Sequence, residues 1–259
     1  MYLPQLLKMS EAGEKLAALT CYDASFARLL SEAGVDILLV GDSLGMAIQG
    51  HDSTLPVSLE HMVYHTAAVR RGAPSAFIMA DLPFGSYQAS PAQAFSSGAS
   101  LLSAGANMVK LEGGEVMVES VRFMTQRGIP VCAHLGLLPQ SVNQTGYRAQ
   151  ARDSRAAQQL ISDAAALEAA GASLLVLESI PALLAEEVSR CLRIPTIGIG
   201  AGVNCDGQVL VLADLLGLTE RPPRFARNFM TDSAGIKEAI SLYVAMVKSG
   251  QFPGPEHSV

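Results

Sequence analysis

Six short apolar stretches of the sequence end in polar residues that can bind a cation or move a proton. These residues are Asp23, Asp42, Ser43, Asp81, Lys110, Glu112, His134 and Glu178. If the stretches are strands of one parallel barrel, their C-terminal ends meet at a single rim, where barrel enzymes carry their active sites. The acids that end the second, third, fourth and sixth stretches would repel one another there without a counter-charge. The pattern therefore predicts a cation-binding site.

The residue types in this set favour a hard metal ion. Carboxylate oxygens select such ions, and two or three of them with room for water and substrate oxygens suit Mg2+ better than a closed calcium cage. The cysteines form no Cys-x-x-Cys pair and are irregularly spaced, at Cys21, Cys132, Cys191 and Cys205. Neither a zinc site nor a disulfide framework is therefore expected, and the thiols are expected to be reduced in a cytoplasmic protein.

Glu178 is the candidate proton acceptor. It follows the sixth expected strand, across the barrel from the acids of the second to fourth strands, and burial beside other acids can raise the pKa of a carboxyl group. Lys110 is expected to neutralise part of the acid cluster and to hold an anionic oxygen of a substrate. A Schiff-base role for Lys110 is one alternative, and an ion-pair network that only stabilises the rim is another. Ser43 lies in no nucleophile elbow, so it is expected to donate a hydrogen bond to substrate.

A repeated pattern of helix end, glycine, apolar run and acid positions these residues. It occurs around Gly34, Gly105 and Gly171, which are 71 and 66 residues apart. Glycine suits the left-handed position that ends a helix, and a short apolar run suits a strand buried on both faces. Each spacing accommodates two strand–helix units, which is the period of a (β/α)8 barrel.

The expected fold is a single (β/α)8 TIM barrel domain covering residues 1–259, with an extra N-terminal helix. The expected strands cover residues 17–20, 37–40, 76–80, 108–111, 131–133, 174–177, 196–199 and 209–213. The last is ambiguous, because residues 209–216 fit a buried helix equally well. Residues 1–8 and 233–249 are expected to form helices outside the repeat that close the barrel floor or mediate assembly.

Three further segments attract attention. Residues 135–153 are polar and too long for an ordinary strand–helix loop, which predicts a lid or substrate loop. Arg221, Arg224 and Arg227 concentrate basic charge, which can meet an anionic ligand tail or a partner subunit, or simply be solvated. The glycines of residues 198–202 do not match the dinucleotide fingerprint, and they fit a tight turn as well as a close approach to a ligand.

The composition excludes several classes of protein. Because 49% of residues are apolar and only 16% are charged, the chain can bury a large core and is not a disordered protein. Its net charge of −6 argues against nucleic acid as a partner. No uninterrupted apolar run reaches the length of a membrane span, so no membrane partner is expected. Glu11, Glu14 and Lys15 lie where a signal peptide would need apolar residues.

Several segments together resemble one enzyme family. They are residues 19–23 (Leu-Thr-Cys-Tyr-Asp), 41–46 (Gly-Asp-Ser-Leu-Gly-Met), 53–57 (Ser-Thr-Leu-Pro-Val), 81–87 (Asp-Leu-Pro-Phe-Gly-Ser-Tyr), 110–114 (Lys-Leu-Glu-Gly-Gly), 134–137 (His-Leu-Gly-Leu), 139–141 (Pro-Gln-Ser), 197–202 (Ile-Gly-Ile-Gly-Ala-Gly) and 205–208 (Cys-Asp-Gly-Gln). In this order and spacing they resemble the ketopantoate (3-methyl-2-oxobutanoate) hydroxymethyltransferase family. Leu138, where the family commonly has threonine, and residues 147–150 depart from its pattern.

The resemblance implies a reaction. Members of the family are Mg2+-dependent (β/α)8 barrels that transfer a one-carbon unit from 5,10-methylenetetrahydrofolate to 3-methyl-2-oxobutanoate. The product is 2-dehydropantoate, which leads to pantothenate and coenzyme A. The resemblance also implies a homo-oligomer in the form of a large ring, often a homodecamer.

The resemblance implies roles for the site residues as well. It implies that the metal or its waters are held by Asp42, Asp81 and Glu112. It implies that the keto acid contacts Asp42, Ser43, Asp81 and Lys110. Glu178 is then the proton acceptor, and His134 is a neighbouring group of the substrate site.

Two alternatives stay open at the level of sequence. One is another Mg2+-dependent barrel enzyme for 2-oxo acids, of the isocitrate lyase and phosphoenolpyruvate mutase kind, although the Lys-Lys-Cys-Gly-His segment of isocitrate lyases does not occur in the sequence. The other is a non-catalytic assembly barrel, which would not need Lys110, Glu112 and Glu178 together.

Overall fold

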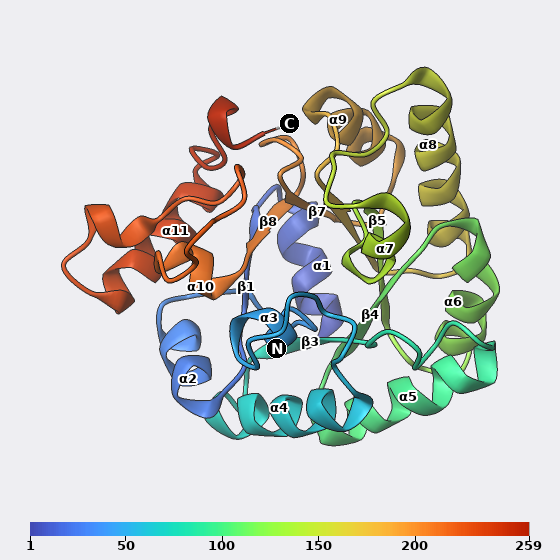
Figure 1. Ribbon diagram of the computed structural model, residues 1–259, viewed down its shortest axis with the longest axis horizontal. Coiled ribbons are helices and arrows are strands. Elements are labelled where there is room, and N and C mark those ends of the chain that lie inside the picture. The colour runs from blue at the N-terminus through green and yellow to red at the C-terminus, as the bar shows by residue number, and fades with distance from the viewer. Residues whose placement is uncertain (259) are drawn as a thin grey trace.

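The computed structural model describes residues 1–258 and contains a closed barrel of eight parallel strands that follow one another in chain order (Figure 1). The strands are β1 (Leu16–Thr20), β2 (Ile37–Val40), β3 (Phe77–Asp81), β4 (Met108–Glu112), β5 (Val131–Gly136), β6 (Leu174–Glu178), β7 (Thr196–Ile199) and β8 (Gly207–Leu210). β8 pairs with β1 and closes the ring. The expected (β/α)8 TIM barrel is therefore confirmed, and Val259, the last residue of the expected domain, lies outside the described residues.

The expected position of the eighth strand was wrong. The strand covers Gly207–Leu210 instead of residues 209–213, because the chain leaves the sheet after Leu210 and forms a short helix, α10 (Leu212–Leu215). A side chain on Gly207 would lie 2.5 Å from the carbonyl oxygen of Leu16, so the strand begins where its backbone approaches β1 closely. One apolar run thus serves both a strand end and a buried helix, which periodicity alone does not separate.

Helices surround the barrel and connect consecutive strands (Figure 1). They include α2 (Ala24–Glu32), α3 (Leu44–Ala47), α4 (Leu59–Gly72), α5 (Pro91–Ala104), α6 (Val118–Thr125), α7 (Val142–Thr145), α8 (Ser154–Ala169), α9 (Ala182–Cys191) and α11 (Ile236–Lys248). Short 3-10 turns occur at η1 (Glu115–Met117), η2 (Pro139–Ser141), η3 (Phe229–Asp232) and η4 (Pro255–His257). None of the helices found in residues 1–258 combines the length and the apolar character that crossing a bilayer requires.

The expectation that α11 lies outside the repeat was wrong. α11 packs against β1, β8 and α2, which is the place of the eighth barrel helix. The hydroxyl group of Tyr243 in α11 is 2.9 Å from the carbonyl oxygen of Ala18 in β1 and 3.0 Å from that of Gln208 in β8. The long irregular segment before α11 hides this relation in the sequence, because the helix does not follow its strand directly.

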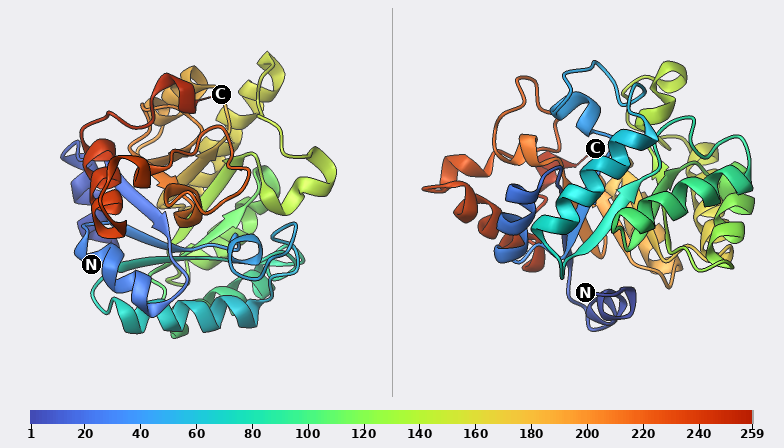
Figure 2. Two further views of the ribbon diagram at one scale, coloured as in Figure 1. Left: turned by 60° about the vertical axis from the view of Figure 1, so that its left-hand side comes forward. Right: turned by 90° about the horizontal axis from the view of Figure 1, so that it is seen from below.

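The N-terminal helix α1 (Leu3–Glu11) closes one end of the barrel. Figure 2 shows it below the strands, at the end opposite the long connecting loops. Leu6 is fully buried and belongs to the same apolar cluster as interior residues of the strands, including Leu16 and Ile37. The expected extra helix is therefore present, and of the two roles considered for it, the structure supports closure of the floor.

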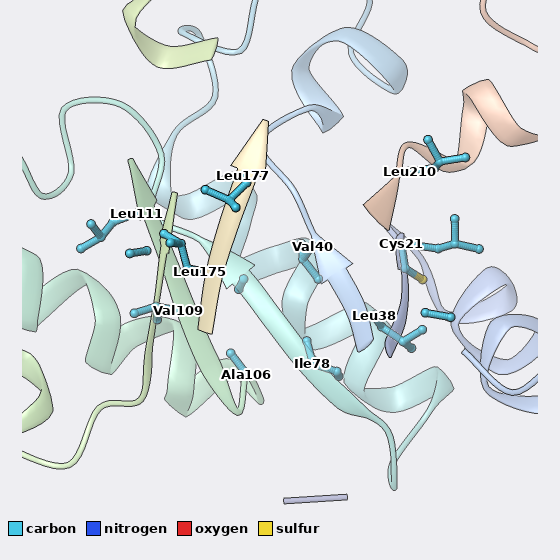
Figure 3. Close-up of a cluster of buried hydrophobic side chains, with 14 of the residues drawn as sticks. Cys21, Leu38, Val40, Ile78, Ala106, Val109, Leu111, Leu175, Leu177 and Leu210 are labelled. Atoms are coloured by element: carbon cyan, nitrogen blue, oxygen red, sulfur yellow. The ribbon is translucent and has the colours of Figure 1, made fainter. Parts of the chain in front are cut away.

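Alternate residues of each strand face opposite sides of the barrel wall. In β4, Val109 and Leu111 belong to the apolar cluster between the strands and the surrounding helices, part of which Figure 3 shows. Met108 belongs instead to the interior cluster. Lys110 and Glu112 share the parity of Met108, so the pleat places both of them on the inner face.

Candidate active site

The side chains selected from the sequence share one cavity. It has a volume of about 1100 Å3 and lies at the C-terminal ends of the strands. Its lining includes Asp42, Ser43, Asp81, Lys110, Glu112, His134 and Glu178. The structure therefore gathers in one place residues from five separate strand ends, and α1 closes the opposite end of the same barrel.

Strand register makes these side chains neighbours. Asp81 of β3 is paired with Lys110 of β4, and Glu112 of β4 is paired with His134 of β5. Glu178 ends β6 beside the last residue of β5. Paired residues of adjacent strands carry their side chains on the same face, so each pair meets inside the barrel.

Lys110 is buried within the acid cluster. Its Nζ lies 3.1 Å from Oδ1 of Asp81, whose Oδ2 accepts a hydrogen bond from the backbone NH of Asp42 at 3.1 Å. Burial lowers the pKa of Lys110, but the negative charges of Asp81, Glu112 and Asp42 outweigh it and raise that pKa above its ordinary value. A protonated Lys110 disfavours the Schiff-base alternative, because that chemistry needs a neutral amine.

His134 lies between two carboxylates. Its Nδ1 is 3.4 Å from Oε1 of Glu112, and its Nε2 is 3.3 Å from Oε2 of Glu178. Burial and the charge of Lys110 lower the pKa of His134, but the nearby carboxylates of Glu112 and Glu178 outweigh both and raise it above its ordinary value. The imidazole therefore connects Glu178 with the acids on the other side of the cavity.

Ser43 faces the cavity from the segment that follows β2. Its Oγ is 2.8 Å from the hydroxyl oxygen of Tyr22, a buried side chain. Burial raises the pKa of Tyr22 well above its ordinary range, so Tyr22 remains a neutral phenol that can donate to Ser43. The hydroxyl proton of Ser43 is then free to point at a ligand, as its expected role requires.

Gln140, which sequence reasoning did not select as a site residue, ties the acid cluster together. Its Nε2 donates to Oδ2 of Asp42 at 2.8 Å and to the carbonyl oxygen of Leu82 at 2.9 Å. Its backbone NH donates to Oε2 of Glu112 at 3.0 Å, and its Oε1 accepts from the hydroxyl group of Tyr87 at 2.7 Å. The only signal in the sequence was the family-like Pro-Gln-Ser segment, since neither spacing nor periodicity shows that a loop glutamine is buried.

Two features at other strand ends do not contribute to the cavity. Asp23 caps α2, because its Oδ1 accepts hydrogen bonds from the backbone NH groups of Ser25 and Phe26 at 2.7 and 2.9 Å. After β7, Gly200 and Gly202 have φ angles of 62° and 84°, which L side chains rarely adopt. These angles fit the tight turn considered for this glycine-rich segment, and a close approach of its backbone to a ligand stays a prediction.

The segment after β5 borders the mouth of the cavity. β5 extends to Gly136 and is followed by η2 and α7, so residues 135–153 are more regular than expected. Tyr147, Arg148 and Ala149 of this segment line the cavity. Its action as a lid stays a prediction.

The acid cluster suits a cation by charge. Burial raises the pKa of Asp42 and of Asp81, and for Asp42 the negative charges of Asp81 and Glu112 raise it further. Oδ1 of Asp81 is buried and accepts no well-oriented hydrogen bond, although Lys110 is close by. A divalent ion that keeps some of its waters would relieve this repulsion.

The side-chain positions do not by themselves define a metal cage. Within residues 1–258, no group of three or more His, Cys, Asp or Glu side chains is placed to hold a metal ion directly. The assignment of Asp42, Asp81 and Glu112 to the metal or its waters therefore stays a prediction.

Known proteins resemble this chain along nearly its whole length. A family model described as ketopantoate hydroxymethyltransferase matches residues 1–255. The chain belongs to the ketopantoate hydroxymethyltransferase family. It is therefore an enzyme of the transferase class, and the activity of this family is hydroxymethyl transfer to 3-methyl-2-oxobutanoate.

Curated members of the family are close in sequence. The 3-methyl-2-oxobutanoate hydroxymethyltransferase of Thiobacillus denitrificans is 60% identical over 257 residues, which are 99% of this chain and 98% of that protein. The enzyme of the same name from Nitrosospira multiformis is 60% identical over 253 residues, 97% of this chain and 96% of that protein. Family membership excludes the non-catalytic barrel considered from the sequence.

Solved structures share the fold at much lower identity. Phosphonopyruvate hydrolase in complex with oxalate and Mg2+ has a TM-score of 0.63 and 13% identity, over 82% of this chain and 81% of that one. Oxaloacetate acetylhydrolase in complex with 3,3-difluorooxalacetate has a TM-score of 0.62 and 14% identity, over 98% of both chains. The likeness to these proteins shows a common barrel, whereas the ketopantoate hydroxymethyltransferase assignment rests on sequence over the full chain.

Proposed function

We propose that this enzyme takes its one-carbon unit from 5,10-methylenetetrahydrofolate and joins it, with Mg2+ bound, to C3 of 3-methyl-2-oxobutanoate. The product is 2-dehydropantoate, on the route to pantothenate and coenzyme A. The observation that carries the proposal is the position of Glu178, which faces the acid cluster across one cavity through His134. A base on one side and a cation site on the other suit removal of a proton from the carbon beside a carbonyl group.

The proposed ligands of Mg2+ or its waters are Asp42, Asp81 and Glu112. When bound, the ion supplies Lewis acidity toward the oxygens of the keto acid. Lys110, held by Asp81 at 3.1 Å, contributes a fixed positive charge for the substrate carboxylate. Ser43 donates a hydrogen bond to the same substrate, which also borders Asp42, Asp81 and His134.

Glu178 is the proposed acceptor of the C3 proton. Its side chain is 13% exposed, in contrast to 3% for His134, so it is the more accessible member of the pair. Proton transfer breaks the C3–H bond, puts the proton on Glu178 and leaves the electron pair in the enolate of the keto acid. The methylene carbon is bonded to N5 and N10 of the folate: its bond to N10 breaks, water adds to it and supplies the hydroxyl oxygen of the product, and C3 bonds to it as its bond to N5 breaks. The two protons that N10 and N5 take up come from the water and, through Glu178, from C3, so tetrahydrofolate leaves.

His134 is proposed to hold Glu178 in position for this transfer. Nε2 of the buried imidazole lies 3.3 Å from Oε2 of Glu178, so the ring limits the orientations that the carboxylate can adopt. Residues 135–153 are proposed to limit the entry of water, which would otherwise protonate the enolate.

Two wider properties are proposed from the family resemblance. The enzyme is expected to act in the cytoplasm, and to assemble from identical subunits into a ring such as a homodecamer. Sedimentation of the purified protein tests the assembly: a species of a single chain mass at working concentration would contradict it.

The central experiment supplies purified protein with 3-methyl-2-oxobutanoate, 5,10-methylenetetrahydrofolate and Mg2+, and measures 2-dehydropantoate by mass spectrometry. We expect product only when both substrates are present, and loss of most of the rate after chelation of divalent ions. Product formation without the folate donor would contradict the proposed co-substrate. A rate that chelation leaves unchanged would contradict the metal dependence.

A further inference from the structure

The wall of the cavity changes character between its floor and its mouth. The buried acid cluster lies at the bottom of the cavity. The mouth is lined by the exposed residues Arg148, Arg221 and Arg224, here called the arginine rim. Arg148 lies on the segment after β5, and the other two lie on the irregular segment after α10. Two loops far apart in the sequence thus bring three guanidinium groups to one opening.

The arginine rim has no internal partners of opposite charge. All three side chains are exposed, and within residues 1–258 no ion pair shorter than 4.0 Å involves any of them. Glu220 also lines the cavity but pairs with none of them. Among the described residues, the one hydrogen bond that a guanidinium group of the rim makes to protein runs from Nε of Arg224 to the carbonyl oxygen of Glu256, at 3.3 Å. Their charge is therefore available to a ligand.

Arg227, the third basic residue of this segment, behaves differently. Its guanidinium group pairs with Asp232 at 2.9 Å and stacks over the ring of Phe229 at 4.8 Å. Arg227 is also absent from the cavity lining. The structure thus separates a structural arginine from two arginines that face the opening, a distinction that the sequence did not make.

Apolar side chains also line the cavity that holds the acid cluster and the arginine rim. Met46, Tyr147 and Leu218 line the cavity although their side chains are 44%, 55% and 73% exposed, and the partly buried ring of Phe225 lines it as well. Large apolar groups exposed inside a cavity are typical of a site for a flat or aromatic ligand. A cavity of about 1100 Å3 also has room for more than a small oxo acid.

We propose that the arginine rim binds the carboxylates of the glutamyl tail of the folate co-substrate, while its ring system lies on the apolar surface beneath. This inference rests on the proposed co-substrate. The acid cluster repels the anionic tail, and the arginine rim attracts it. The cavity therefore accepts the folate with its tail outward and its one-carbon end toward C3 of the keto acid. The charge pattern thereby sets the orientation of the second substrate.

The test compares two ligands that differ only in the tail, tetrahydrofolate and tetrahydropteroate, which lacks glutamate. Their affinities are measured by anaerobic calorimetry for the wild type, for Arg221→Ala combined with Arg224→Ala, and for Arg148→Ala. Arg155→Ala is the matched control, because Arg155 is an exposed arginine of α8 outside the cavity. Thermal melting of each variant checks that it is folded.

We expect the double variant to bind tetrahydrofolate about tenfold more weakly, and tetrahydropteroate less than twofold more weakly, because exposed charge-assisted hydrogen bonds contribute on this scale. Added salt should shrink the difference between the two ligands in the wild type. In turnover, KM for the methylene form of tetrahydrofolate should rise by a similar factor while kcat stays unchanged.

Three results would overturn the inference. Wild-type protein that binds the two ligands equally has no tail site, and equal losses for both ligands in the double variant would show a general disturbance of the cavity. Retention of full tetrahydrofolate affinity by every rim variant would place the tail elsewhere. If wild-type protein neither binds tetrahydrofolate nor uses its methylene form, the proposed co-substrate itself is wrong, which distinguishes the two failures.

Discussion

Two carboxylates of the same cavity have opposite pKa shifts because they face different partners. Burial raises the pKa of Asp42, and the charges of Asp81 and Glu112 add to that effect. Burial acts in the same direction on Glu112, but His134 and Lys110 outweigh it and lower its pKa. Residue identity alone does not assign such roles, since these two acids at strand ends differ in their pKa shifts only through their neighbours.

Glu178→Gln tests the proton acceptor at this scale. Glutamine keeps the shape but cannot take the C3 proton, so we expect the rate to fall on the order of 10²- to 10⁴-fold, with affinities for Mg2+ and keto acid nearly intact. The measurement is turnover together with exchange of the C3 proton in heavy water. Exchange as fast in the variant as in the wild type would reject Glu178 as the base.

Asp81→Ala tests the metal role. Removal of this carboxylate should weaken Mg2+-dependent binding of 3-methyl-2-oxobutanoate at least about tenfold, as measured by calorimetry with and without the ion. Because the change also leaves the buried Lys110 without its partner Asp81, Asp81→Asn serves as a second variant that keeps the volume of the side chain. Equal affinities with and without Mg2+ in both variants and the wild type would contradict the assignment.

At the scale of elements, one glutamine joins the segment after β5 to the acid cluster. Gln140 contacts Asp42, Leu82, Glu112 and Tyr87, which belong to or follow three other strand ends. The turn η2 is therefore not only a connection: it supplies donors to two of the proposed metal-binding carboxylates and fixes their orientation.

Gln140→Met tests this arrangement. Methionine has a similar volume but leaves Oδ2 of Asp42 and the hydroxyl group of Tyr87 without this partner. We expect a loss of roughly 1–3 kcal/mol in the free energy of unfolding and a roughly 10- to 100-fold weaker Mg2+-dependent affinity for the keto acid. Gln144→Met, an exposed change in the neighbouring helix α7, is the control and should alter neither quantity. An unaltered affinity in a folded Gln140 variant would show that the glutamine only packs.

At the scale of the whole molecule, the residues that stabilise the barrel through apolar packing and the residues of the candidate site lie at opposite ends of its axis. α1 closes the floor with Leu6 fully buried among interior side chains, while the candidate site opens at the other end. The end closed by α1 thus depends on apolar packing, and the opposite end carries the charged residues of the candidate site.

Leu6→Ala tests this separation. The cavity left in the floor should lower the free energy of unfolding by about 2–5 kcal/mol in urea denaturation, while kcat/KM of the folded enzyme stays within about twofold. Leu183→Ala, at a side chain that is 80% exposed, should change stability by less than about 0.5 kcal/mol. A large loss of kcat/KM in folded Leu6→Ala protein would show that the two ends are coupled.

The sequence by itself determined the barrel, most strand positions and the residues that meet at its mouth. Apolar runs such as residues 37–40, and the acids that follow them, are local signals. Because alternate side chains of a strand face opposite sides, the position of a residue in the run also predicts its face. The family assignment was also readable, because it depends on several motifs in order and not on their contacts.

Only the tertiary structure decided which polar side chains contact one another. The burial of Gln140, the position of His134 between Glu112 and Glu178, and the division between Arg227 and the arginine rim all depend on contacts between segments distant in the chain. The place of α11 as the eighth helix was hidden for the same reason. Hydrophobic periodicity indicates which side of an element is buried. The partner of a polar side chain depends on how distant segments pack together, which the local sequence does not predict.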